Sequence, residues 1–166
     1  MHESYLINTP DLFHKVLDRM RDATIIALDT ETTGFEPLKD KIVGISLCFD
    51  GESAYYIPLR HKDYDKNLDE KFVLTALQAA TEGKLIVMHN SKFDYRFFKH
   101  AGWTIENEIF DTMNADYLLD PDRAHSLDAC SLRELDIVKI TTEEIIGRGE
   151  TQTTFDKVDA KTVCKY

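Results

Sequence analysis

Two carboxylic acids, Asp29 and Glu31, stand two positions apart at the end of an apolar run over residues 24–29. In a β-strand, residues at this spacing project from the same face, so the two carboxylates converge. A hard divalent cation relieves their repulsion, and oxygen ligands without nearby cysteine or paired histidine favour Mg²⁺ or Mn²⁺. The pair indicates either a metal site or merely the solvated end of a strand.

A second apolar run covers residues 84–88 and is followed by the stretch His-Asn-Ser-Lys-Phe-Asp over residues 89–94. The last residue of this stretch, Asp94, is a third carboxylic acid. We expect it in the first turn of a helix, where the helix dipole alone favours an acid and where Asn90 is placed to be the N-cap. The sequence contains no glycine-rich phosphate loop and no nucleophile elbow. The combination of acids at two strand ends therefore favours metal-assisted chemistry over phosphate binding by a glycine-rich loop and over catalysis by a nucleophilic side chain.

The elements that position these acids follow from hydrophobic periodicity. A helix is expected from Thr9-Pro10 to Met20, and strands over 24–29, 41–49 and 53–59 form an antiparallel meander in which Val43, Ile45, Leu47 and Phe49 share one face. Helix and strand then alternate, with further elements expected at 72–80, 84–88, 91–101, 109–112, 112–119, 126–135 and 142–146. Thr142 is the expected cap of the last helix. The pattern predicts an α/β or α+β sheet with helices outside it.

Composition limits the class of protein. The chain has 166 residues, 43% hydrophobic and 30% charged, which fits one globular domain. Three widely spaced cysteines predict a reducing compartment, and the absence of a signal peptide or apolar span predicts a cytoplasmic protein with no membrane contact. A formal net charge of -10 argues against broad attraction to nucleic acid. Metal ions bound by the carboxylates would nevertheless supply positive charge locally.

Five motifs make the sequence recognisable. LDTETTGF (28–35), VMHNSKFDYRFF (87–98), FDTMNADYLLD (110–120), HSLDACSLREL (125–135) and TTFDKVDAKTVCKY (153–166) closely resemble the proofreading 3'-5' exonuclease domain of bacterial family A DNA polymerases. The resemblance extends from about Ser4 onward. It implies a ribonuclease H-like α/β fold whose mixed five-stranded sheet, an antiparallel meander followed by parallel strands, is flanked by helices.

The resemblance also implies a catalytic set. Asp29, Glu31 and Asp94 would be ligands of two Mg²⁺ or Mn²⁺ ions, and Tyr166 would orient the attacking water. The fourth acid of the family pattern would lie four residues beyond Tyr166, so residues 1–166 are expected to be one exonuclease domain that ends within its third motif. Asp111, Asp156 and Asp159 are expected to be surface or helix-cap acids rather than substitutes.

Substrate contacts follow from the same resemblance. Thr32 would meet the terminal sugar hydroxyl, Phe35 would press on the terminal base, and Asn90 and Phe93 occupy similar positions in the family. Core packing is the alternative for Phe35 and Phe93. The implied partners are a DNA 3' end, single-stranded or frayed, and the polymerase domain of the same parent chain. A ribonuclease D-like nuclease that trims RNA and a catalytically inactive structural domain remain the alternatives.

Overall fold

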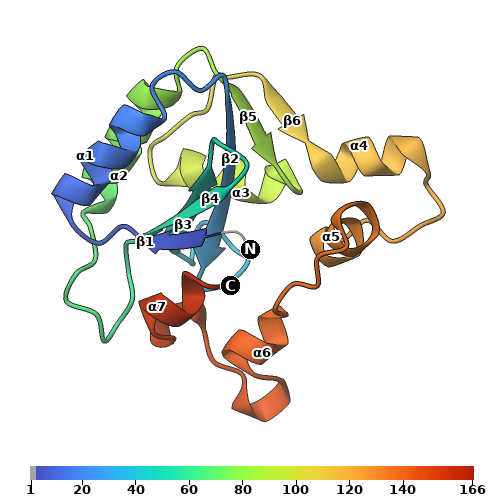
Figure 1. Ribbon diagram of the computed structural model, residues 1–166. Helices are drawn as coiled ribbons and strands as arrows, with labels where there is room; N and C mark the ends of the chain where they lie inside the picture. Colours follow the sequence, from blue (N-terminus) through green and yellow to red (C-terminus); the bar gives the residue numbers. More distant parts are fainter. Residues whose placement is uncertain (1–2) are drawn as a thin grey trace.

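A six-stranded mixed sheet in the order β1-β4-β3-β2-β5-β6 forms the centre of the computed structural model, which describes residues 3–166 (Figure 1). Its strands are β1 (Glu3–Leu6), β2 (Ile25–Thr32), β3 (Ile42–Cys48), β4 (Ser53–Pro58), β5 (Leu85–Met88) and β6 (Ile109–Asp111). β2, β3 and β4 form the predicted antiparallel meander, and β5 and β6 continue the sheet in parallel. The α/β class and the ribonuclease H-like order of meander then parallel strands are confirmed.

The sheet has one strand more than the predicted five, because β1 pairs in parallel with the edge of β4. Three of its four residues are exposed and only Leu6 is partly buried. A strand that contributes backbone hydrogen bonds but almost no buried face leaves no alternation of apolar and polar residues in the sequence, which is why periodicity missed it.

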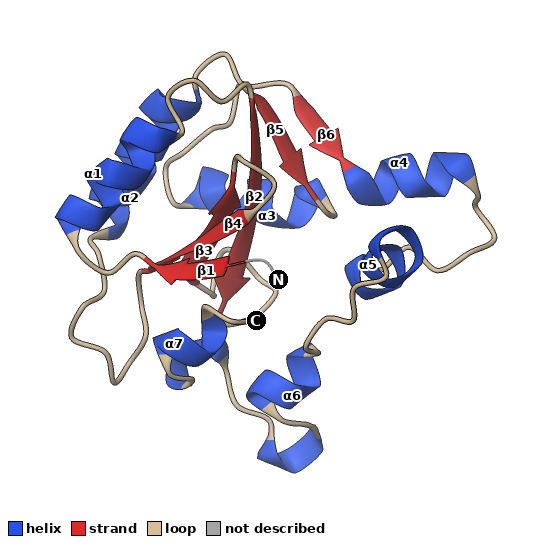
Figure 2. Ribbon diagram, viewed as in Figure 1, coloured by secondary structure: helices blue, strands red, loops and turns tan. Residues whose placement is uncertain are grey.

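Three helices cover one face of the sheet: α1 (Pro10–Arg19), α2 (Glu70–Thr81) and α3 (Ser91–His100) (Figure 2). The N-cap of α1 is Thr9, whose side chain accepts a hydrogen bond from the Leu12 amide, as Thr9-Pro10 predicted. The main core lies between these helices and the sheet, and its fully buried members include Phe13, Ile26, Leu77 and Phe98. This core makes the sheet a rigid support for the ends of β2 and β5.

The other face of the sheet carries a smaller cluster of Val43, Tyr56, Phe155 and Val163, supplied partly by η2 (Phe155–Lys157) and α7 (Ala160–Val163). The expectation that Val43 shares a face with Ile45 and Leu47 is wrong. Glu31 pairs with Gly44 but Thr32 pairs with Ile42, so a bulge at Val43 shifts the alternation by one residue.

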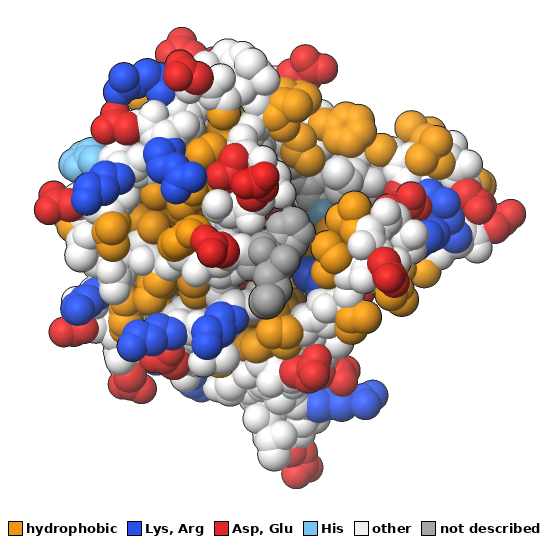
Figure 3. Space-filling model, in the orientation of Figure 1, with side chains coloured by type: hydrophobic (Ala, Val, Ile, Leu, Met, Phe, Trp, Pro, Cys, Tyr) orange, Lys and Arg blue, Asp and Glu red, His pale blue; other side chains and the backbone are white. Residues whose placement is uncertain are grey.

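The helices α4 (Thr112–Leu119), α5 (Leu127–Leu135) and α6 (Thr142–Ile146), with η1 (Gly149–Thr151), extend from β6 as an arm beside the sheet (Figure 1). Asp116 is the only buried residue of α4–α6, and its carboxylate is bound by Arg123, His125 and Arg133. Exposed leucines and valine of α4, α5 and the segment after α5 contribute orange surface in Figure 3. No helix within residues 3–166 is long and apolar enough to cross a bilayer.

The start of α6 also differs from expectation. Its N-cap is Thr141, not Thr142, because the Thr141 side chain accepts from the Glu144 amide while the Glu144 carboxylate accepts from the Thr141 amide. This reciprocal capping box needs a glutamate three residues after the cap, which Thr141 has. Thr142 is thereby free to contact another part of the chain.

Candidate active site

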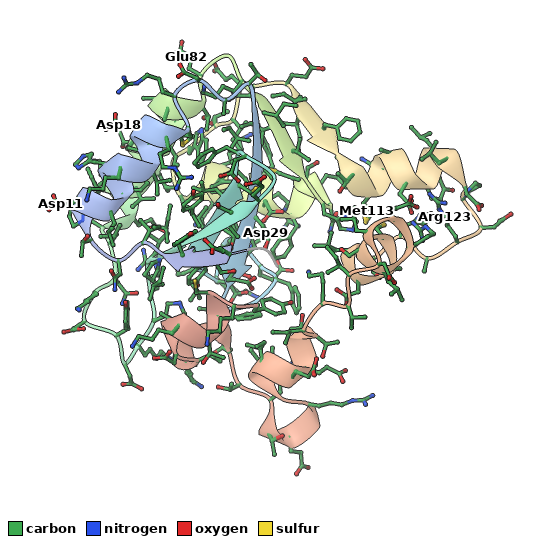
Figure 4. All side chains as sticks on the ribbon, in the orientation of Figure 1. Asp11, Asp18, Asp29, Glu82, Met113 and Arg123 are labelled. Atoms are coloured by element: carbon green, nitrogen blue, oxygen red, sulfur yellow. The ribbon has the colours of Figure 1, made fainter. Side chains whose placement is uncertain are left out.

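The two acids of β2 lie on the sheet face opposite the main core. Leu28 points into the core, whereas Ala27, Asp29 and Glu31 alternate with it and line the hollow on the second face. Figure 4 shows Asp29 between the sheet and the helical arm. The prediction that Asp29 and Glu31 project from the same face of the strand is therefore confirmed.

Asp94 reaches the same place from the first turn of α3. β5 pairs with β2 only through residues 25–27, so the Thr30 amide points past the end of β5. One oxygen of the Asp94 carboxylate accepts this N–H at 2.9 Å and the Thr30 hydroxyl at 2.6 Å. Asp94 is 2% exposed. The acid of the second motif is thus fixed beside the strand that carries the first two.

All eight predicted site residues line one pocket of about 630 Å³, between β2, α3 and the arm. These residues are Asp29, Glu31, Thr32, Phe35, Asn90, Phe93, Asp94 and Tyr166. A neighbouring hollow over the second sheet face, lined by Ser46, Cys48 and Tyr56, shares Asp29, Glu31 and Tyr166 with it. Segments as far apart as β2 and the C-terminal residues therefore meet at one location.

Burial makes the ionised form of these acids costly. Burial raises the pKa of Glu31 to about 9, and the nearby charges of Asp29 and Asp94 add to the rise. Burial likewise raises the pKa values of Asp29 and Asp94, although the Lys139 charge opposes the rise at Asp29 and the Thr30 hydrogen bonds oppose it at Asp94. Three carboxyl groups that resist ionisation together form a site in which a cation would be strongly favoured.

The donor chemistry fits a hard divalent cation, because the side chains that converge are carboxylates. Within residues 3–166, however, no three acidic, histidine or cysteine side chains lie close enough together to form a ready metal site. The oxygen of Asp94 that Thr30 binds is engaged with β2. Asp29, Glu31 and Asp94 line one pocket, but their carboxylates are not close enough together to coordinate a single ion.

Tyr166 is half-buried in the lining of the pocket. Its hydroxyl is 2.6 Å from the Thr142 hydroxyl, and its ring packs on Phe155 with the centroids 5.6 Å apart. Burial raises the pKa of Tyr166, so its hydroxyl stays protonated at neutral pH and can donate a hydrogen bond. The contact with Thr142 joins the C-terminal segment 153–166 to the start of α6.

Phe35 and Phe93 form the aromatic wall of the pocket, with ring centroids 6.3 Å apart. Phe35 is 81% exposed, which rules out core packing for it. Phe93 also packs on Phe97 and on the core, so the core-packing alternative holds for this residue. An exposed ring backed by a fixed one is suited to stacking on a planar group.

Thr32 and Asn90 supply polar groups beside the acids. The Thr32 hydroxyl donates to the Gly34 carbonyl at 2.6 Å. Asn90 is the N-cap residue of α3, as predicted, and lies in the left-handed region with φ 60° and ψ 51°, but its side chain makes no capping hydrogen bond. Asp111 instead accepts the amides of Asn90 and Ser91. The side-chain amide of Asn90 therefore forms no hydrogen bond with the first turn of α3.

Two of the other acids near the site are helix caps, as expected. Asp111 is the N-cap of α4, and Asp159 is the N-cap of α7. Asp156 is instead buried, contrary to the expected surface or cap position, and its carboxylate lies 2.9 Å from the Lys62 ammonium group. The pocket residues that sequence reasoning missed include Thr30 and Lys139, since neither residue type signals an acidic site by itself and Lys139 meets β2 only through the tertiary fold.

The inner strand β2 ends in two acids, and a third acid lies in α3, the helix that follows the neighbouring strand β5. Together with the mixed sheet, this arrangement is typical of ribonuclease H-like nucleases. The family described as 3'-5' exonuclease matches residues 5–166, and the chain belongs to it. DNA polymerase I of Pseudomonas aeruginosa is 33% identical over 153 residues, which are 88% of this chain and 17% of that protein. DNA polymerase I of Treponema pallidum is 30% identical over 185 residues, covering 87% and 18% of the two chains. The chain thus spans less than a fifth of these relatives.

Solved structures share the fold at lower identity. Escherichia coli RNase D, described as an exoribonuclease involved in structured RNA processing, has a TM-score of 0.65 and 20% identity, over 86% of this chain and 36% of that one. Brucella melitensis NrnC with bound Mg²⁺ has a TM-score of 0.61 and 19% identity, over 86% and 66% of the two chains. Both likenesses establish the fold of the sheet and helices described above.

Proposed function

We propose that this 3'-5' exonuclease domain shortens DNA from the 3' end as the proofreading module of a DNA polymerase I. The observation that carries the proposal is that Asp29, Glu31 and Asp94, from two separate elements, line one pocket together with an exposed aromatic ring. The curated relatives named DNA polymerase I support DNA as the substrate and a polymerase domain as the partner. Residues 1–166 then act as one domain, and a cytoplasmic location stays a prediction.

The three carboxylates would hold the divalent cations, Mg²⁺ or Mn²⁺. When bound, such cations activate water near neutral pH and stabilise the charge that develops on the departing oxygen. Tyr166 orients the attacking water through its protonated hydroxyl. Thr32 and Asn90 hydrogen-bond the terminal nucleotide, and Phe35, backed by Phe93, stacks on its base, which gives a grip that tolerates any sequence.

The proposal is tested by incubating the chain with 5'-labelled single-stranded DNA and with RNA of the same sequence, in Mg²⁺ and in Mn²⁺. Stepwise shortening of DNA from the 3' end is expected, with slower or no shortening of RNA. Asp29→Asn should abolish hydrolysis, while Asp22→Asn, which changes an exposed acid away from the pocket, should not change it.

Two results would contradict the proposal. Preferential degradation of RNA would assign the chain to ribonuclease D-like trimming instead. Equal hydrolysis by the wild-type chain and by Asp29→Asn would show that the carboxylate pocket is not the reaction site.

A further inference from the structure

We propose that Lys139 binds the phosphate of the 3'-terminal linkage and is a substrate-contacting residue of the exonuclease site. The inference rests on the proposed function, because it assigns a role within the same pocket. Lys139 lies in the segment between α5 and α6, more than one hundred positions from the acids of β2, and the fold of the arm brings it to them.

Its position is the first argument. Among residues 3–166, Lys139 is the only lysine or arginine that lines the pocket of Asp29, Glu31 and Asp94. Its Nζ lies 5.6 Å from the centre of the Tyr166 ring, and its side chain is 23% exposed. The ammonium group therefore lies beside the tyrosine expected to orient the attacking water, and solvent can still reach it.

Charge is the second argument. Lys139 lines the same pocket as Asp29 and Glu31, so its positive charge acts on both acids. Its one ion-pair partner within residues 3–166 is Asp128, and their separation of 3.7 Å is long for a charge-assisted hydrogen bond. An ammonium group with three donors and one distant partner retains the capacity to bind an anion.

The substrate supplies such an anion. A domain with a net charge of -10 must bring a polyanion to a pocket lined by three carboxylates. Bound cations would neutralise the carboxylates, and a flexible lysine in the pocket lining would contact a non-bridging oxygen of the phosphate as a point charge. Lys139 would thereby offset the repulsion that the terminal phosphate meets on entry.

The test is a double-mutant cycle on binding, read by fluorescence anisotropy in Ca²⁺ so that it does not depend on turnover. The ligands are a labelled six-residue oligothymidylate and its analogue with a neutral methylphosphonate at the 3'-terminal linkage. Lys139→Met keeps the length of the stem and removes the charge. Lys71→Met, which changes an exposed lysine on α2, is the matched control.

Lys139→Met should weaken binding of the normal oligonucleotide about tenfold, as expected for loss of one charged contact. The methylphosphonate should weaken binding to the wild type by a similar factor, about tenfold. It should have little effect on binding to Lys139→Met, since the two changes remove the same contact. Lys139→Arg should retain most of the affinity. Asp128→Asn should tighten binding two- to threefold by releasing the lysine.

Independent penalties from the lysine and phosphate changes would overturn the inference. Tighter Mn²⁺ binding and faster hydrolysis in Lys139→Met would also overturn it, because the lysine would then occupy the place of a cation. Failure of the proposed function is distinguishable from these results: a coupled binding cycle without any hydrolysis in Mg²⁺ or Mn²⁺ would contradict the nuclease activity and leave the phosphate contact supported.

Discussion

Thr30 and Asp94 are 64 positions apart, and one carboxylate oxygen of Asp94 accepts both the amide and the hydroxyl of Thr30. Thr30 stands between Asp29 and Glu31 in β2. The two hydrogen bonds therefore fix the acid of α3 relative to the acids of the strand. They also lower the pKa of Asp94 against the rise caused by burial and by the Asp29 charge.

Thr30→Val removes the hydroxyl donor with little change of shape and leaves the amide donor in place. We expect about tenfold slower release of the 3' nucleotide, because Asp94 is less well fixed and its pKa rises further. The free energy of unfolding should fall by about 1 kcal/mol, the typical value of one buried hydrogen bond. Single-turnover hydrolysis in Mg²⁺ and urea unfolding measure the two effects.

Thr81→Val is the matched control. The Thr81 hydroxyl is also buried and donates to the Leu77 carbonyl at 2.8 Å, on α2 away from the pocket. It should lose similar stability and keep the wild-type rate. If Thr30→Val and Thr81→Val hydrolyse equally fast, the hydroxyl of Thr30 has no part in positioning Asp94.

The stability of the metal-free chain should depend on pH through Glu31. Its folded-state pKa of about 9 lies above its ordinary value of 4.5, so the folded state retains a proton that the unfolded state loses. The contribution of Glu31 is fully present below pH 4.5 and is lost as the pH rises through 9, by on the order of 1 kcal/mol per pH unit. Asp29 and Asp94, whose pKa values are also raised, act in the same direction.

Urea unfolding in EDTA at pH 5, 7 and 9 measures this dependence. Glu31→Gln should be more stable than the wild type at pH 9 and should show a smaller loss between pH 5 and 9. Glu52→Gln, at an exposed glutamate in the turn between β3 and β4, should keep the wild-type slope. A wild-type stability that rises over this range would contradict the buried state of Glu31.

The elements around the acids were predictable because each is specified locally. Neighbouring residues are enough to specify the apolar runs before Asp29 and before His89. The same is true of the helix cap at Thr9. β1 and the bulge at Val43 were not predictable, because both depend on the partner strand and not on their own side chains. Lys139 was missed for a related reason: its proximity to Asp29 is created by the path of the arm.

Phe35 should contribute to affinity and not to stability. It is 81% exposed and contacts Phe93 from the outer side of the pocket. Because stacking of one base on an aromatic ring is worth about 1–3 kcal/mol, Phe35→Ala should raise the Kd for a single-stranded 3' end at least about fivefold. The melting temperature should not change. Anisotropy titration in Ca²⁺ and thermal unfolding provide the measurements.

Leu38→Ala is the control for Phe35, since Leu38 lies in the same loop and is also 81% exposed. Both variants remove an exposed apolar side chain, but only Phe35 lines the pocket. Equal effects of the two substitutions on affinity would argue that the loop attracts DNA through general apolar surface and not by stacking on Phe35.

Substitutions of Tyr55 and Tyr56, which are adjacent in β4, can show how the C-terminal segment that carries Tyr166 is fixed to the sheet. The Tyr56 hydroxyl is 2.8 Å from Nε2 of His61, whose Nδ1 donates to the Val158 carbonyl at 2.8 Å. Gly44 is required for this arrangement, because a Cβ there would lie 2.2 Å from the Tyr56 hydroxyl. The chain of hydrogen bonds joins the sheet to the segment just before α7.

Tyr56→Phe should therefore lower the free energy of unfolding by about 1–3 kcal/mol, since it leaves a buried ring nitrogen of His61 without a partner. Amide hydrogen exchange should increase over residues 155–164. Tyr55→Phe is the control, because Tyr55 is equally buried at 2% exposure and its hydroxyl has no hydrogen-bond partner within residues 3–166. Removing that hydroxyl should be neutral or stabilising. Equal destabilisation by both substitutions would show that ring packing, and not the link through His61, holds the C-terminal segment in place.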